Sequence, residues 1–158
     1  MTDFSASRQI PLIIGGKDVE TILTFKVKEP GTERVVHEAS SATLPEVKAA
    51  LDSAQAAYVS WAKSKTDTRR SVLLRVAELM EERRQELLGY VLEETSADKH
   101  FADFGITLGI NLVKDVAGKV SGISGYSPRL ADDATALVYK EPYGVMLGIA
   151  PWYEIRVA

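Results

Sequence analysis

The segment from Tyr139 to Trp152 reads YKEPYGVMLGIAPW, an apolar run between two groups of turn residues. Val145 to Ile149 is apolar at every side-chain position, a pattern that is typical of a strand buried within a sheet. A Pro-Tyr-Gly turn precedes this run, and Ala150-Pro151 ends it, because proline cannot donate to a strand ladder. Thr135 to Tyr139 also has the residue types of a strand. The segment therefore predicts two strands, 135–139 and 145–149, joined by a turn.

Residues 10–36 also have the composition of short strands. Leu12 to Ile14 is apolar and rich in β-branched residues, and Gly15-Gly16 behind it can turn with positive φ. Thr21 to Val27 alternates in polarity before Glu29-Pro30-Gly31 interrupts the pattern. This region predicts two or three short strands, which we expect to pair antiparallel.

Three stretches have the 3.6-residue apolar period of amphipathic helices. The first opens with a capping box in which Thr43 and Glu46 flank a proline, and its apolar stripe is expected to face inward. The second continues toward Thr95 and carries its charged residues on a solvated face. The helices are expected to start near Leu44, Thr68 and Ala97. Their candidate caps are Thr43, Thr66 or Asp67, and Ser96 or Asp98.

The third helix is rich in glycine. Each glycine costs about 1 kcal/mol relative to alanine in a helix interior, so we expect another backbone to approach closely at these positions. They are Gly105, Gly109, Gly118 and Gly122. Together the patterns predict an α+β fold with one core, in which three main helices pack beside short strands.

Composition excludes several classes of function. The chain has 158 residues, 46% of them hydrophobic, which suits one packed domain. Its formal charge of -3 disfavours a nucleic-acid partner, and the absence of cysteine excludes disulfides and thiol chemistry. Residues 10–14 form an apolar run that is much too short to span a membrane, and the N-terminus lacks a secretory cleavage pattern. We therefore expect a cytoplasmic chain without membrane or nucleic-acid partners.

Few residues have the spacing of a reactive site. His37 and His100 lie far apart without neighbouring ligands, so no metal site is expected. Gly122 to Gly125 looks like part of a nucleophile elbow, but it follows a helix and is better explained as a helix C-terminal turn. Tyr126 and Tyr143 are weak catalytic candidates as acids or hydrogen-bond donors, although tyrosines in strands more often pack their rings.

The segment from Tyr139 to Trp152 resembles the E-P-x-G-V-x-x-x-I-x-P-W stretch of NAD(P)-dependent aldehyde dehydrogenases. Three upstream groups resemble the N-terminal region of that family in the same order: Ile14–Lys17, Ala54–Trp61 and Arg70–Met80. The resemblance covers about Ile10 to Trp152. Among the subfamilies, the sequence resembles most the dehydrogenases for aromatic aldehydes such as salicylaldehyde or vanillin.

The resemblance implies a single N-terminal domain of that fold at residues 10–152, after a flexible N-terminus at 1–9 and before a divergent tail at 153–158. In the family, the catalytic cysteine, the general base and the cofactor site lie beyond this stretch. We therefore expect no complete nucleotide-binding domain and no bound cofactor. A remnant of the family's cofactor strand is present, namely Ile149, Ala150, Pro151 and Trp152.

Two positions depart from the family pattern. Tyr153 stands where the family has an asparagine that stabilises the oxyanion, and it is a weak catalytic candidate because a phenol donates a hydrogen bond. Ser96 stands where the family usually has glycine, so the turn there is expected to differ. The sequence alone assigns no catalytic residue and no substrate.

Three functions stay open. The first is a non-redox role, such as binding, cyclisation or isomerisation of a small carbonyl-containing or aromatic metabolite, in a protein not competent for NAD-dependent oxidation. The second is an interaction module that pairs with itself or with a full-length aldehyde dehydrogenase, and for it we expect a homo-oligomer formed through residues 134–149. The third is a functionless truncation of an oxidoreductase that acts on aldehydes.

Overall fold

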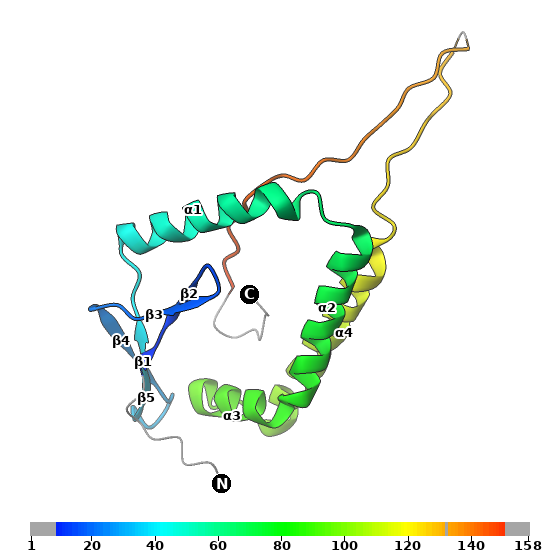
Figure 1. The fold of residues 1–158 in the computed structure, drawn as a ribbon. Coiled ribbons are helices and arrows are strands. Elements are labelled where there is room, and N and C mark those ends of the chain that lie inside the picture. Colours follow the sequence, from blue (N-terminus) through cyan, green and yellow to red (C-terminus); the bar gives the residue numbers. More distant parts are fainter. Residues whose placement is uncertain (1–8, 132, 151–158) are drawn as a thin grey trace.

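The computed structural model describes residues 9–131 and 133–150, in which the strands precede the helices (Figure 1). The strands lie at one end of the molecule, and α1 connects them to the helices α2 and α4, which lie side by side. The strands are β1 (Gln9–Ile10), β2 (Leu12–Ile14), β3 (Lys17–Val19), β4 (Thr24–Lys28) and β5 (Val35–Ser40). The helices are α1 (Leu44–Trp61), α2 (Thr66–Glu82), α3 (Arg84–Thr95) and α4 (Lys99–Val120).

The strands form one three-stranded sheet and one hairpin. β5 is the central strand of the sheet, with β4 antiparallel on one side and β1 on the other. β1 runs parallel to β5, so the expectation of only antiparallel pairing is wrong there. The Gln9 side-chain amide donates to Thr21 O at 2.9 Å and to Ser40 Oγ at 2.8 Å. These hydrogen bonds hold β1 beside β5 in the parallel direction. β2 and β3 pair antiparallel around Gly15 and Gly16, whose φ values are +62° and +74°, as the sequence predicts.

Helix α1 begins at its predicted cap. The Thr43 backbone N–H donates to Glu46 Oε2 at 2.8 Å, and the Thr43 hydroxyl donates to the same carboxylate. These bonds, the hydroxyl's first, lower the pKa of Glu46 below its ordinary value. The expected inward direction of the apolar stripe is wrong, however, because none of the 18 residues of α1 is buried. Of the described elements, β2 contacts α1, but this contact leaves the apolar residues of the helix exposed.

The second predicted helix is divided in the structure, which gives four helices in the described chain instead of three. α2 ends at Glu82, and Arg83 leaves the helical conformation with φ −99° and ψ 16° before α3 starts. The turn lets Leu88 of α3 reach α4. The proposed α2 caps are also wrong, since Thr66 is already the first helical residue and Lys65 precedes it.

Helix α4 begins at one of its two predicted caps. The Asp98 side chain accepts from the backbone N–H groups of His100 and Phe101 at 2.9 and 3.2 Å. Ser96 instead ends α3 in a left-handed conformation with φ 49°, which favours glycine. Its hydroxyl donates to Pro30 O at 2.9 Å and so connects this turn to the β4–β5 loop. Ser96 therefore replaces the family's glycine at a turn whose backbone conformation still favours glycine, and the difference lies in its side chain.

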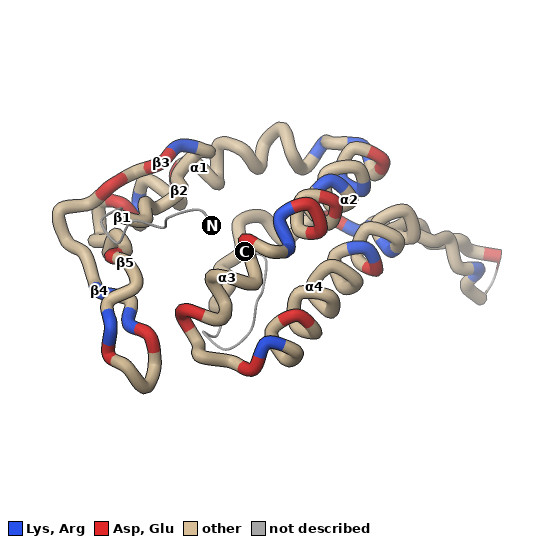
Figure 2. The backbone as a smooth tube through the Cα atoms, turned by 90° about the horizontal axis from the view of Figure 1, so that it is seen from below, with Lys and Arg blue, Asp and Glu red and all other residues tan. Residues whose placement is uncertain are grey.

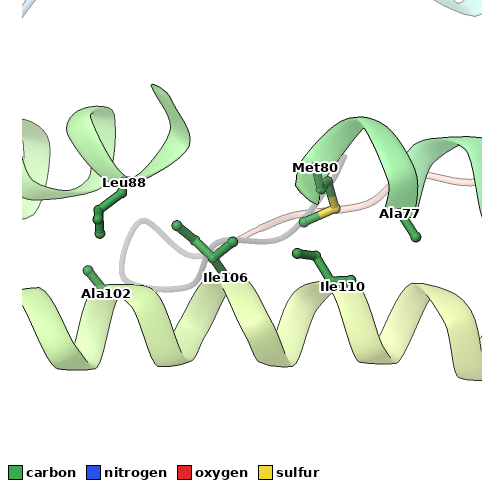
Figure 3. Packing of buried hydrophobic residues seen from close by; sticks show 6 residues of the cluster. All are labelled: Ala77, Met80, Leu88, Ala102, Ile106 and Ile110. Atoms are coloured by element: carbon green, nitrogen blue, oxygen red, sulfur yellow. The ribbon is translucent and has the colours of Figure 1, made fainter. Parts of the chain in front are cut away.

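The core lies where α2 and α3 pack on α4 (Figure 3). Met80, Leu88 and Ile106 meet there, and Ile106 has no exposed surface. Arg84 supports the same junction, since its guanidinium donates to Asp103 Oδ1 at 2.7 Å and to Thr107 Oγ1 at 3.1 Å. The buried cluster consists of Ala77, Met80, Leu88, Ala102, Ile106 and Ile110. No helix of the described residues is long and apolar enough to cross a membrane.

The predicted strands at 135–139 and 145–149 are wrong. Residues 125–131 and 133–139 form a protruding arm that is held by isolated bridges, Tyr126 with Val138 and Arg129 with Thr135 (Figure 1). These bridges do not join into a continuous ladder, so 135–139 is not a strand. Residues 145–149 have no ladder in the described chain, and composition alone does not supply a hydrogen-bonded partner. The expected flexible N-terminus and the divergent tail lie almost entirely outside the described residues.

Gly118 and Gly122, two of the four glycines of the third predicted helix, do not mark the close approach that was expected. A Cβ at Gly118 would meet open space, and one at Gly122 would touch only Lys119 O of its own turn, at 3.4 Å. The close approach occurs at Gly125, where a Cβ would lie 2.1 Å from Val138 O. Glycine is therefore required at the base of the arm, because any side chain there would force its two backbones apart.

Ile106→Ala should lower the free energy of unfolding by about 2–5 kcal/mol, because it leaves a cavity at the centre of the cluster. Leu108→Ala on the same helix is the matched control and should cost less than about 1 kcal/mol, since Leu108 is largely exposed. Urea denaturation followed by circular dichroism measures both. Equal losses would contradict the placement of the core.

Candidate functional site

The tyrosine candidates do not converge on a site. Tyr126 lies at the base of the arm, where its backbone exchanges hydrogen bonds with Val138. Tyr143 lies in the segment that follows the arm and is 96% exposed. Neither hydroxyl has a hydrogen-bond partner in the part of the chain that the structure describes. Tyr153 lies outside the described residues, so the structure brings no pair of these groups together.

The remnant of the cofactor strand is also open to solvent. Ile149 is 85% exposed, and Ala150 is exposed as well, while Pro151 and Trp152 lie outside the described residues. Tyr58 of α1 donates to Pro142 O at 3.5 Å, a long hydrogen bond between α1 and this segment. A pyrophosphate is normally held by a glycine turn and a helix N-terminus directly after such a strand. Residues 145–150 have neither the ladder nor this helix among the described residues, so they do not fit a dinucleotide.

The histidines have separate structural roles. His37 Nε2 of β5 lies 3.3 Å from Glu94 Oε1 of α3, and the His37 side chain is 15% exposed. His100 lies in the first turn of α4, where its backbone N–H is capped by Asp98. Among residues 9–131 and 133–150, no three His, Cys, Asp or Glu side chains are grouped to hold a metal ion. The expectation that there is no metal stays a prediction.

The remaining sequence features form no reactive site either. Gly122 to Gly125 follows α4 as a turn, in which the Gly122 N–H donates to Lys119 O at 3.0 Å, so the interpretation as a helix end is confirmed. A shallow hollow lies along one face of α3. Its lining comes from that helix alone, which cannot enclose a substrate. The lining residues are Gln85, Glu86, Gly89, Tyr90 and Glu93.

The most prominent feature is a set of exposed apolar faces, which the sequence reasoning assigned to the interior. Val47, Leu51 and Trp61 along α1 are each about half exposed. Residues 145–149 are exposed, with Leu147 at 86%. A third face runs along α4 on the side away from α2. A signal for it was present in the sequence, because α4 has apolar residues on two sides, and one neighbouring layer cannot cover both.

These elements constitute part of a larger fold. The crystal structure of a salicylaldehyde dehydrogenase from Pseudomonas putida G7, complexed with salicylaldehyde, matches 85% of this chain with a TM-score of 0.80 and 23% identity. The match covers 28% of that protein's chain. An NAD-dependent benzaldehyde dehydrogenase from Corynebacterium glutamicum matches 80% of this chain with a TM-score of 0.73 and 28% identity. The predicted class, an α+β fragment of the aldehyde dehydrogenase fold, is confirmed.

Sequence similarity identifies the family. Residues 18–153 match the aldehyde dehydrogenase family, and the chain belongs to that family. It is 35% identical over 146 residues to the vanillin dehydrogenase of Pseudomonas sp. HR199, which covers 90% of this chain and 30% of the relative. A salicylaldehyde dehydrogenase of Pseudomonas sp. C18 is 27% identical over 130 residues. The chain thus spans about 30% of the length of these relatives.

We predict that calorimetric titration of the 158-residue chain with NAD⁺ and with NADP⁺ gives no binding heat. The reason is the open, unpaired state of residues 145–150. A full-length vanillin dehydrogenase titrated under the same conditions is the positive control. A micromolar isotherm for this chain would contradict the prediction and would mean that its exposed apolar residues rearrange into a nucleotide site.

Proposed function

We propose that this chain is a non-catalytic interaction module of the aldehyde dehydrogenase type. It pairs through residues 134–149 with a second copy of itself or with an aldehyde dehydrogenase subunit. The observation that carries the proposal is the extended apolar run 145–149, which has no strand ladder among the described residues. The expected location in the cytoplasm is part of this proposal.

Backbone chemistry supports pairing at 145–149. Buried or associated backbone N–H and C=O groups need partners, and an apolar strand with open edges recruits another strand. Met146, Leu147 and Ile149 are 75–86% exposed, so the side chains also gain from being covered. Lys140 and Glu141, which would discourage edge pairing, lie before this run and leave it unguarded.

The arm adds a second, weaker surface to the proposal. The Val138 N–H is not available to a partner strand, because it already donates to Tyr126 O at 2.9 Å within the arm. A substitution at Val138 would therefore not test pairing with another chain. Leu137 and Tyr139 on the same strand of the arm are largely exposed and remain available to a partner. The decisive position lies instead in the run 145–149.

Leu147→Pro should shift the protein from oligomer to monomer. Proline removes the N–H at the centre of the run and prevents it from donating to a partner strand. Leu147→Ala is the matched control, since it shortens the side chain but keeps the N–H, and it should retain most of the association. Sedimentation velocity at tens of micromolar measures the three proteins.

Three outcomes of that experiment count against the module. A wild-type protein that stays monomeric would mean that the run needs no partner of this kind. Equal loss in Leu147→Pro and Leu147→Ala would assign the association to side chains instead of strand pairing. Aggregation of all three proteins would favour the remaining alternative, a functionless truncation.

A second candidate is a non-redox role on a small carbonyl-containing or aromatic metabolite. It is favoured by the relatives, which are named as vanillin and salicylaldehyde dehydrogenases. Tyr126 and Tyr143 are largely exposed, so their hydroxyls can donate to a carbonyl oxygen. A cyclisation or isomerisation would need no oxidant, so the missing cofactor site is no obstacle to it.

This role predicts reversible binding of vanillin or salicylaldehyde without NAD⁺. Tyr143→Phe should weaken the affinity by about tenfold if its hydroxyl donates to the aldehyde oxygen. Line broadening in proton NMR spectra of the aldehyde, with wild-type protein, the variant and a buffer blank, measures the binding. Wild-type broadening equal to the blank would reject the role.

A further inference from the structure

Two polar contacts join the sheet of β1, β4 and β5 to the C-terminal end of α3, which lies beside it in Figure 1. The Ser96 hydroxyl donates to Pro30 O at 2.9 Å, and His37 Nε2 of β5 lies 3.3 Å from Glu94 Oε1 of α3. The buried apolar cluster does not extend across this junction, because its six residues come from α2, α3 and α4. Polar groups therefore help to hold the sheet against α3.

His37 is the group in these contacts whose charge can change near neutral pH. Histidine side chains as a class take up a proton between about pH 8 and about pH 5. The His37 side chain is 15% exposed and the Glu94 side chain is 41% exposed, so water screens the pair only in part. A protonated imidazole attracts a carboxylate at this distance, whereas a neutral imidazole has no net charge with which to attract it. The contact is therefore stronger at low pH.

The charges on β1 and β4 lie away from His37. Its register partner on β4 is Val27, which is uncharged. Lys26 of β4 and Glu38 of β5 are also register partners, but successive residues of a strand point to opposite faces, so these two lie on the other face of the sheet. On β1, the uncharged Gln9 is the partner of Glu38. The two neighbouring strands thus supply no direct substitute for Glu94 among the described residues.

The charged groups of the β4–β5 connection are paired with one another. Lys28 Nζ lies 2.7 Å from Glu33 Oε2, and Arg34 Nε lies 3.2 Å from Glu29 Oε2. The Thr32 hydroxyl and then the Arg34 guanidinium lower the pKa of Glu29, so this carboxylate stays ionised across the range in which histidine titrates. The connection therefore keeps constant charges while His37 titrates.

Helix α3 favours a cation at the position of His37. Glu94 lies in the last turn of the helix, where the helix dipole stabilises a nearby positive charge. The other titratable side chains of this part of α3 line the hollow described above, namely Glu86, Tyr90 and Glu93. The carboxylate that meets His37 is thus that of Glu94, and both its charge and its place in the helix favour a protonated imidazole.

We propose that the His37–Glu94 pair is a pH-sensitive contact that regulates how firmly the sheet is held on α3. With His37 protonated, the pair and the Ser96–Pro30 hydrogen bond both hold the sheet. When the proton is lost, the hydrogen bond remains and the sheet opens more readily. The stabilisation from the pair is present at low pH and is lost as the pH rises through the range in which histidine titrates. No residue of 145–149 takes part, so the inference is independent of the proposed strand pairing.

The test is hydrogen exchange of the 158-residue chain near pH 5.5 and near pH 8, followed in peptides from β4 and β5 and corrected for the intrinsic exchange rate at each pH. Glu94→Gln keeps the size and polarity of the side chain but removes its charge. It should lower the protection of these peptides by at least about threefold at the lower pH and by less than about 1.5-fold at the higher pH. In a His37→Gln background, Glu94→Gln should have the same effect at both pH values.

Two control variants separate the pair from its surroundings. Glu93→Gln removes the neighbouring charge of α3 and should leave the protection of β4 and β5 unchanged at both pH values. Ser96→Gly removes the hydroxyl that donates to Pro30 O but suits the backbone φ of 49°. It should lower the protection by the same factor at both pH values, because neither partner of that hydrogen bond titrates.

Three results would overturn the inference. Glu94→Gln could lower the protection equally at both pH values, which would make the contact a fixed structural one. Its pH-dependent effect could persist in the His37→Gln background, which would assign the titration to another group. Glu93→Gln could reproduce the effect, which would assign it to the general charge of α3. Circular dichroism of each variant should show the wild-type helix content, because both glutamates lie outside the buried cluster.

Discussion

The packing of α4 against α2 and α3 is the interaction on which the rest of the structure depends. Ile106 is enclosed there, and the Arg84 guanidinium holds the start of α3 to Asp103 of α4 at 2.7 Å. Glu81 and then Asp103 raise the pKa of Arg84 further above its usual range, so this cation is charged at every pH at which the protein folds. The junction fixes the turn at Arg83 and leaves the other face of α4 directed outward.

That arrangement explains why so much apolar surface stays open. Burial of apolar area is the main favourable term in folding, and the described residues obtain most of it where α2 and α3 pack on α4. The strands are held by their own ladders, and α1 is held by its cap, by a contact with β2 and by the Tyr58–Pro142 hydrogen bond. The exposed faces of α1, α4 and residues 145–149 are therefore the features from which a function is to be sought, and they favour a protein partner over a small-molecule pocket.

Local chemistry was predictable from the sequence, whereas pairing was not. The Thr43–Glu46 box, the Asp98 cap and the Gly15-Gly16 turn each depend on neighbouring residues, and each is present. The strand at 145–149 depends on a partner elsewhere, and an apolar run carries no information about whether that partner is present. The site candidates stay predictions for the same reason, because Tyr126 and Tyr143 gain a role only when a fold brings them together.

Hydrogen exchange resolved by peptide tests the central claim most directly, with the chain kept at a concentration below that of its association. We predict strong protection of amides in α2 and α4, weak protection in α1, and exchange near the rate of an unfolded chain at 145–149. Protection of α1 equal to that of α4 in the isolated chain would contradict the account, because it would mean that the apolar face of α1 is already covered.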